Sequence, residues 1–99
     1  MKKIVLVCAA GMSTSILLKK MKEAAEKMEF KCTIEAHPVA EVKEVGKAAD
    51  IVLLGPQVGF QLSSVKAQVE CPAEVIDMIA YGTMDGSKII KHVKEVIGE

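Results

Sequence analysis

Apolar and polar residues along the chain occur in blocks, and most blocks have the period of a strand or of a helix. Short apolar runs, and one run that alternates strictly, predict strands. The predicted strands lie at residues 3–7, 31–36, 50–54 and 74–76. Apolar residues three or four positions apart predict helices. The predicted helices lie at residues 13–29, 39–45, 58–71 and 85–97, while residues 78–82 fit neither period.

The alternation of strands and helices is typical of βαβ units, which build a mainly parallel sheet. The run at 50–54 is the most apolar and is expected inside the sheet, whereas the alternating run at 31–36 is expected at an edge. Right-handed crossovers with helices on both faces then predict a flavodoxin-like open sheet of four parallel strands in the order 2-1-3-4. The 99 residues suffice for one such domain, spanning 1–99.

The turn between the first strand and the first helix contains the most distinctive chemistry. Cys8 ends the apolar run, and Gly11 and a hydroxyl cluster precede the first helix, for which Ser13 is the predicted N-cap. A helix N-terminus offers free N–H groups and a positive dipole end to an anion, so a thiol here is expected to ionise more readily than a free one. The predicted anion cradle comprises Ala9, Ala10, Gly11, Met12, Ser13, Thr14 and Ser15.

A second turn is expected beside the first. In a doubly wound sheet the ligand site lies beyond the carboxyl ends of the strands, at the switch point between the first and third strands. Gly55, Pro56 and Gln57 directly follow the third predicted strand. We therefore expect this turn to lie next to Cys8.

Overall composition excludes several classes of protein. Basic and acidic residues balance at 13 each, which argues against a sequence-independent nucleic-acid or anionic-membrane binder. The apolar stretch at 4–10 is short for a signal peptide and is followed by no clear cleavage site, and no run approaches the ~20 apolar residues that span a bilayer. Three cysteines without a Cys-x-x-Cys pair indicate neither a disulfide framework nor a zinc site. A cytoplasmic protein without metal or cofactor is expected.

The absence of arginine restricts what a thiol in this loop can do. The tyrosine phosphatases, including the low-molecular-weight class, place a cysteine in a similar loop but require arginine six positions later, where this chain has Thr14. Lysine cannot reproduce the bidentate charge of arginine on a phosphoryl group. The glycine patterns of nicotinamide-binding turns and Walker loops are also absent. What remains is a cradle of backbone amides and hydroxyls with a nucleophile inside it, which is suited to accept a phosphoryl group.

Structural roles compete with functional ones for several residues. Free cysteine is often buried, so Cys8 taken without its loop is more typical of a core thiol, and the loop and the later motifs reverse that preference. Cys32 and Cys71 have no comparable loop, and His37 and His92 have no metal-ligand partner at a suitable spacing. We expect these last four residues to be structural.

The residues Cys-Ala-Ala-Gly-Met-Ser-Thr-Ser at positions 8–15 closely resemble the active loop of enzyme IIB of the lactose/cellobiose/chitobiose class, in the bacterial phosphoenolpyruvate-dependent sugar phosphotransferase system (PTS). The similarity continues in three later segments and so spans nearly the whole chain. These segments are Val-Leu-Leu-Gly-Pro-Gln at 52–57, Glu-Val-Ile-Asp at 74–77 and Tyr-Gly-Thr-Met-Asp-Gly at 81–86.

The resemblance implies a phosphoryl carrier. It implies that Cys8 accepts phosphate from a phosphohistidine of enzyme IIA and passes it to a β-linked disaccharide held by the membrane permease, enzyme IIC. It also implies that residues 9–15 cradle the phosphoryl group, with residues 55–57 as neighbours. Two alternatives remain from the residues themselves: a non-catalytic module that senses phosphate state, and an independent thiol phosphatase.

Overall fold

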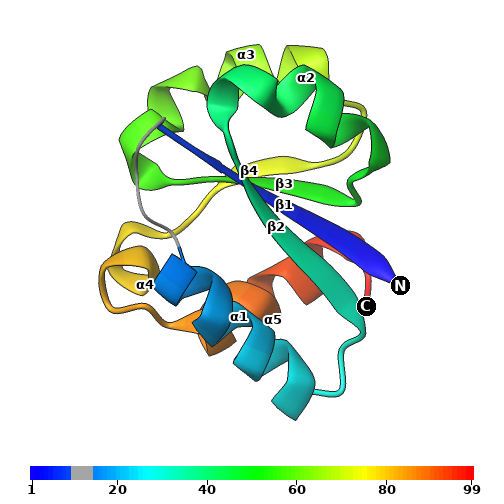
Figure 1. Ribbon diagram of the computed structural model, residues 1–99, viewed down its shortest axis with the longest axis vertical. Helices are drawn as coiled ribbons and strands as arrows, with labels where there is room; N and C mark the ends of the chain where they lie inside the picture. Colours follow the sequence, from blue (N-terminus) through cyan, green and yellow to red (C-terminus); the bar gives the residue numbers. More distant parts are fainter. Residues whose placement is uncertain (10–14) are drawn as a thin grey trace.

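The computed structural model describes residues 1–9 and 15–99. Four strands within these residues form a single parallel sheet in the order β2-β1-β3-β4, as predicted (Figure 1). The strands are β1 (Lys2–Cys8), β2 (Cys32–Pro38), β3 (Ile51–Leu54) and β4 (Ala73–Val75). β2 lies at an edge and β3 in the interior, which confirms both expectations from their hydrophobic patterns.

Helices cover both faces of the sheet. One face is covered by α1 (Ser15–Lys27), α4 (Met78–Gly82) and α5 (Gly86–Ile97). The other is covered by η1 (Val39–Glu41), α2 (Val42–Val45), η2 (Gly46–Ala48), η3 (Pro56–Gln61) and α3 (Leu62–Gln68), where η marks a 3₁₀ helix. We call these the long-helix face and the short-helix face.

Strand side chains divide between the faces by simple alternation. In β1, Ile4 and Leu6 belong to the cluster under the long helices, whereas Val5 and Val7 belong to the cluster under the short ones. β3 follows the same rule with its odd-numbered residues toward the long-helix face. Even-numbered residues of β1 and odd-numbered residues of β3 therefore face the long helices, and the other residues of these two strands face the short ones.

Two of the predicted helices are broken into shorter pieces. The segment predicted at 39–45 continues to Ala48, because Gly46 does not end it: its φ of −72° is helical, and it lies buried against Val69. The helix predicted from 58 is a 3₁₀ helix from Pro56 followed by α3, with non-helical backbone at Val58 (φ −113°, ψ 17°). The predicted helix end at residue 97 is confirmed, and Gly98, which follows it, has a left-handed φ of 77°.

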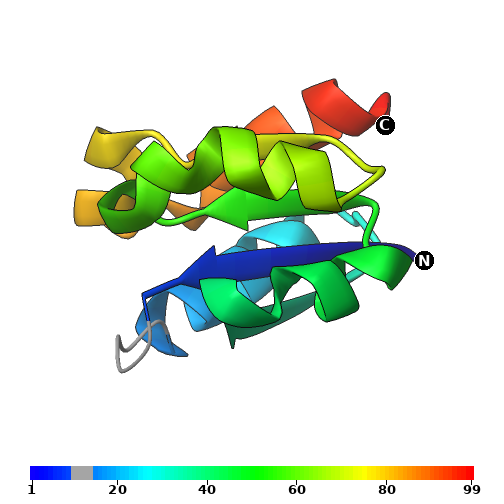
Figure 2. The same cartoon turned by 90° about the horizontal axis from the view of Figure 1, so that it is seen from above.

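The carboxyl ends of the strands gather several loops at one end of the molecule. The arrowheads of β1 and β3 point toward the end where η3 and α4 lie (Figure 2). In the described part of the chain, no helix combines the length and apolar character needed to cross a membrane. The end that holds η3 and α4 is where the sequence places the candidate chemistry.

Candidate active site at Cys8

Cys8 is the last residue of β1 and is 5% exposed. It pairs with Pro38 of β2, and its even parity with Ile4 and Leu6 directs its side chain to the long-helix face. α1, which begins at Ser15, packs on that same face. The thiol thus lies at the end of an interior strand, on the face of the sheet that the long helices cover.

The turn after β3 lies directly beside Cys8. The N–H of Gly55 donates to the carbonyl of Val7 (2.9 Å), and the carbonyl of Gly55 accepts from Val58 N–H (3.0 Å), so the turn is tied to the end of β1. A Cβ built on Gly55 would lie 3.7 Å from Cys8 Cβ and 3.0 Å from Gln57 Oε1. Because Gly55 has no side chain, a space stays open between the thiol-bearing residue and the Gln57 carboxamide.

Tyr81 completes this space, and the sequence interpretation did not assign it to the site. The same Gly55 Cβ would lie 3.7 Å from Tyr81 Cε2. Tyr81 is partly buried against the long-helix cluster and comes from α4, the segment whose period was ambiguous. One feature of the sequence pointed to Tyr81: it follows the fourth predicted strand, and the carboxyl ends of all four parallel strands meet at one edge of the sheet.

The structure describes two of the seven residues of the predicted cradle, Ala9 and Ser15. Ala10, Gly11, Met12, Ser13 and Thr14 lie outside the described residues, so the predicted N-cap at Ser13 does as well. Ala9 is partly buried against the short-helix cluster, and Ser15 begins α1. Pro56 occupies the first position of η3, where its fixed φ suits a helix start.

Burial raises the pKa of the Cys8 thiol above its ordinary value. This direction is opposite to the easier ionisation expected from the loop sequence. The cause is desolvation, because an anionic sulfur loses its hydration among buried neighbours. The resting thiol therefore holds its proton more firmly than a free cysteine does.

Large exposed apolar side chains gather at the same end of the molecule. Seven are exposed within the described residues: Met1, Ile16, Phe60, Val75, Met78, Ile79 and Met84. All except Met1 belong to the start of α1, to η3, or to the segment from the end of β4 to just past α4, which lie toward the Cys8 end (Figure 2). We call these six the apolar rim; patches of this kind mark surfaces that meet other molecules.

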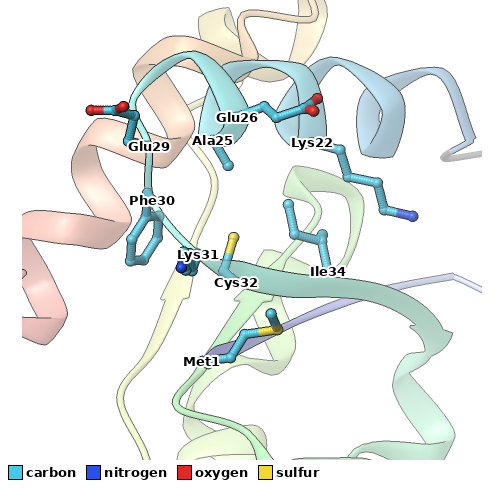
Figure 3. Close-up of a pocket in the computed structure, with 9 residues that line it drawn as sticks. All are labelled: Met1, Lys22, Ala25, Glu26, Glu29, Phe30, Lys31, Cys32 and Ile34. Atoms are coloured by element: carbon cyan, nitrogen blue, oxygen red, sulfur yellow. The ribbon is translucent and has the colours of Figure 1, made fainter.

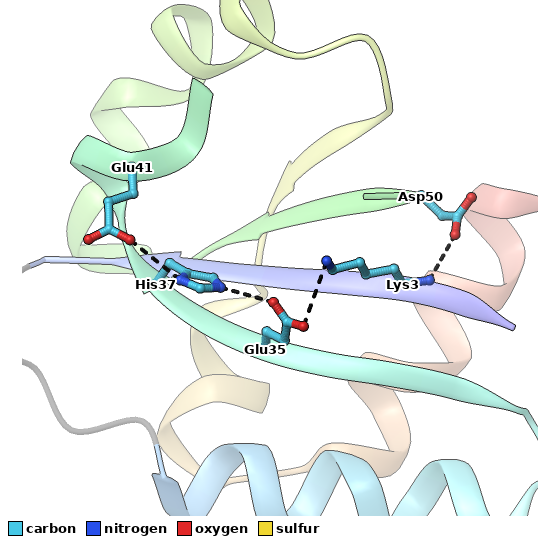
Figure 4. Close-up of polar contacts among 5 residues, drawn as sticks. All are labelled: Lys3, Glu35, His37, Glu41 and Asp50. Atoms are coloured by element: carbon cyan, nitrogen blue, oxygen red, sulfur yellow. Dashed lines mark hydrogen bonds and ion pairs between the residues drawn. The ribbon is translucent and has the colours of Figure 1, made fainter. Parts of the chain in front are cut away.

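A charged network runs along the neighbouring strands β1 and β2, from Lys3 near their start to His37 at the carboxyl end of β2. His37 lies between two carboxylates, 3.0 Å from Glu35 Oε1 and 3.5 Å from Glu41 Oε1 (Figure 4). Lys3 Nζ pairs with Glu35 at 3.7 Å, and Lys3 N–H donates to Asp50 at 2.8 Å. The hydrogen bond with His37, with Lys3 beside it, holds the pKa of Glu35 below its ordinary value. These contacts hold His37 at the carboxyl end of β2, one residue before the register partner of Cys8.

The remaining candidates lie in structural surroundings. His92 is 2.7 Å from Glu74, and Cys32 and Cys71 pack partly buried against the two clusters, where burial raises the pKa of each thiol. Cys32 lines an open pocket of about 470 Å³ between α1 and the start of β2, at the strand ends remote from Cys8 (Figure 3). In the part of the chain that the structure describes, no cluster of three potential metal ligands occurs.

The chain is similar to known proteins along almost its full length. The family model described as "PTS system, Lactose/Cellobiose specific IIB subunit" matches residues 3–92. The oligo-beta-mannoside-specific EIIB component of Bacillus subtilis (strain 168) is 45% identical over 91 residues, covering 89% of this chain and 88% of that protein. The galactose-specific EIIB component of Lactococcus lactis is 39% identical over 97 residues, with 90% of each chain covered.

Solved structures share the fold. The cellobiose-specific IIB component from Borrelia burgdorferi superposes with a TM-score of 0.80 at 34% identity, covering 98% of this chain and 92% of that one. A YwlE mutant from Bacillus subtilis superposes with a TM-score of 0.58 at 14% identity over 100% of both chains, which shows the fold alone.

These comparisons place the chain in a class of phosphoryl-handling proteins. The chain is a member of the lactose/cellobiose-specific IIB subunits of the PTS. Members of this family are phosphotransferase components that pass phosphate to a sugar, so the chain is a sugar-specific phosphoryl carrier of that type.

Proposed function

We propose that Cys8 is the residue that carries the phosphoryl group. The observation that carries the proposal is the open space beside it: Gly55 leaves room next to Cys8, and Gln57 Oε1 borders that room. The described residues contain two other free thiols, Cys32 and Cys71, and neither ends a strand at the carboxyl edge of the sheet. Free thiols fit a reducing compartment, so the proposal places the carrier in the cytoplasm.

The first transfer takes phosphate from a phosphohistidine of enzyme IIA. As the P–N bond of the donor breaks, a P–S bond forms on Cys8, and the imidazole nitrogen that loses phosphorus takes up the thiol proton. The raised pKa of Cys8 favours this coupling, because the thiol needs a base and the departing imidazole becomes one. The partner therefore supplies both the phosphoryl group and the proton acceptor.

The second transfer gives phosphate to a β-linked disaccharide held by enzyme IIC. The P–S bond breaks, a sugar hydroxyl oxygen forms the new P–O bond, and the hydroxyl proton returns to sulfur. Such transfers depend on alignment and on well-placed donors. We assign the donor role to residues 9–15, the stretch of sequence that leads into α1, with residues 55–57 as its neighbours.

The missing arginine suits a carrier. A permanent bidentate cation stabilises a bound phosphoryl group strongly, whereas a carrier must release it. Thr14→Arg is expected to retain phosphorylation of Cys8 but to slow transfer to the sugar, measured as phosphosugar formed in permease-containing vesicles. Unchanged transfer by this variant contradicts the explanation.

The apolar rim is the proposed contact surface for both partners. Phe60, Met78 and Ile79 are 84%, 74% and 72% exposed. A partner covering them would exclude water from Cys8 while the phosphoryl group moves. We expect Met78→Glu to weaken binding to enzyme IIA by about tenfold, as loss of an interface residue typically does. Ala48→Glu, at an exposed position near the start of β3, is the control and should leave binding unchanged.

Intact-mass measurement tests the carrier itself. The chain is incubated with phosphoenolpyruvate, the general PTS proteins and a matching enzyme IIA. The expected result is one added phosphoryl group on wild type and on Cys32→Ser, and none on Cys8→Ser. A chain that takes up no phosphate but binds a partner indicates the sensing module, and turnover of a generic aryl phosphate without partners indicates a thiol phosphatase.

A further inference from the structure

We propose that Tyr81 binds the phosphoryl group on Cys8 through a hydrogen bond donated by its phenolic hydroxyl, an inference that rests on the proposed function. Tyr81 lies across the Gly55 space from Cys8: a Cβ on Gly55 would be 3.7 Å from both Cys8 Cβ and Tyr81 Cε2. Cε2 is the ring carbon next to the one that bears the hydroxyl. A phosphoryl group that enters this space from the Cys8 sulfur therefore approaches the phenol edge of the ring.

Strand parity explains why the three residues meet. Leu53 and Leu6 both face the long-helix cluster, so the Cys8 side chain and a Cβ built on Gly55, each two residues further on, have the same direction. Tyr81 packs partly buried against that cluster. Any side chain at Gly55 would fill the space, which makes its absence a condition for a phosphoryl group there.

α4 holds Tyr81 in a fixed position relative to Gly55. The carbonyl of Asp77 accepts from Tyr81 N–H (2.9 Å), and Asp77 Oδ2 caps the helix by accepting from Ala80 N–H (2.9 Å). Just before α4, Ile76 N–H donates to the carbonyl of Leu54 (2.9 Å), the residue that precedes Gly55. Backbone hydrogen bonds therefore connect the two sides of the space.

The Tyr81 hydroxyl is available as a donor. Among residues 1–9 and 15–99, no hydrogen bond to this hydroxyl occurs, and no buried side-chain oxygen lacks a partner. The hydroxyl must therefore be accessible rather than buried. A phenol donates a directional hydrogen bond without a permanent charge, so it steadies the group without the strong retention that arginine gives.

Tyr81→Phe tests the hydroxyl, because it keeps the ring and its packing. Thr83→Val is the matched control: it removes a hydroxyl from the C-terminal end of α4 that already donates to the carbonyl of Ile79 at 2.8 Å. At a fixed ratio of phosphorylated donor to carrier, we expect Tyr81→Phe to lower the ratio of phosphorylated to free Cys8 about tenfold, as loss of a hydrogen bond to a charged group predicts. Thr83→Val is expected to match wild type.

A titration followed by ³¹P NMR separates binding from a structural effect. A donor that binds the dianion lowers the pKa of a phosphoryl group, so Tyr81→Phe should raise the pKa of phosphocysteine while its Tm stays at the wild-type value. Wild-type behaviour of Tyr81→Phe in both measurements overturns this inference alone. A wild-type chain that is never phosphorylated on Cys8 overturns it together with the proposed function.

Gly55→Ala provides a second variant with the same expectation. Its backbone (φ −61°, ψ 147°) suits alanine, and the closest contact of the new methyl is the flexible end of Gln57 at 3.0 Å. Gly59→Ala, in the 3₁₀ helix η3 that follows the turn, is the control, because its methyl would meet Val75 at an ordinary 3.5 Å. Phosphorylation should fall at least as much in Gly55→Ala as in Tyr81→Phe, and equal phosphorylation of both alanine variants contradicts the role of the space.

Discussion

The two faces of the sheet differ in both their helices and their side chains. The long-helix face is covered by helices of 13 and 12 residues with α4 beside them, and its cluster contains leucine, isoleucine, methionine and phenylalanine. The short-helix face is covered by segments of three to seven residues, and valine and alanine dominate its cluster. Larger buried side chains contribute more free energy of folding each.

The proposed site lies on the face that has the longer helices. Cys8, the Gly55 space and Tyr81 all belong to the side covered by α1, α4 and α5. A site built on long, tightly packed helices is held more precisely than one built on short turns. The comparison predicts that substitutions on the long-helix face cost more stability and disturb the site more.

The largest expected effect is on the core. Ile90→Ala on α5, where Ile90 is 0% exposed, should lower the free energy of unfolding by about 3 kcal/mol because it leaves a cavity. Val65→Ala on α3, where Val65 is 1% exposed, should cost about 2 kcal/mol because fewer atoms are removed. Urea unfolding measures both. Equal or reversed costs would contradict the prediction that the larger side chains of the long-helix face each contribute more stability.

Contact between the two long helices gives the next effect. A Cβ on Gly86, at the start of α5, would collide with the backbone of α1 at Lys20 and Met21. Gly86→Ala should therefore cost about 1–3 kcal/mol, since one helix must move. Gly82→Ala, whose methyl meets nothing within 4 Å, is the control and should not destabilise the protein. A neutral Gly86→Ala would indicate looser packing than described.

The cap of α4 links stability to the site. Asp77→Ala removes the acceptor for Ala80 N–H, so the Tm should fall by a few degrees and phosphorylation of Cys8 should fall with it. That hydrogen bond, with Lys88 nearby, holds the pKa of Asp77 below its ordinary value. Its stabilisation is therefore present above the ordinary carboxyl pKa of about 4 and is lost as pH falls below it.

Thermal unfolding between pH 3 and pH 7 measures this effect. The Tm of wild type should fall further in acid than the Tm of Asp77→Ala, because the variant has no such carboxylate to protonate. Parallel curves would assign the acid sensitivity to other carboxylates.

The smallest effect is expected from the thiols. Burial raises the pKa of Cys32 on the long-helix face and of Cys71 on the short-helix face. A group whose pKa is higher in the folded state stabilises the fold below its unfolded pKa, and that stability is lost as pH rises through the folded pKa. The free energy of unfolding, measured in urea under reducing conditions, should thus fall above pH ~8.5. It should fall less in Cys32→Ala or Cys71→Ala. Identical pH dependence in these variants would exclude the thiols as its source.

The sequence predicted the parts of the fold that have strong local signals. The four strands follow from apolar runs or alternation, and α5 follows from regular spacing with Asp85 as its N-cap and Gly98 as its stop. The breaks at η1–α2–η2 and η3–α3 were missed because short helices are stabilised by what they pack against. α4 was ambiguous because Met78 and Ile79 face outward, which removes the helical period.

The site was predictable in position and less so in chemistry. The rule for parallel sheets placed Cys8 and Gly55 at one switch point, and they are neighbours. Tyr81 is more than seventy residues from Cys8 along the chain, and its approach depends on the packing of α4. The pKa of Cys8 was predicted in the wrong direction because a loop sequence shows the neighbouring donors but not the loss of water around sulfur.

The position of β1 has a consequence for newly made chains. β1 lies between β2 and β3, so β1 gains its second strand neighbour only after residues up to Leu54 have left the ribosome. Until then the nascent chain carries an unshielded thiol that oxidants reach freely. The burial of Cys8 is therefore acquired with the tertiary fold and is not a property of β1 alone.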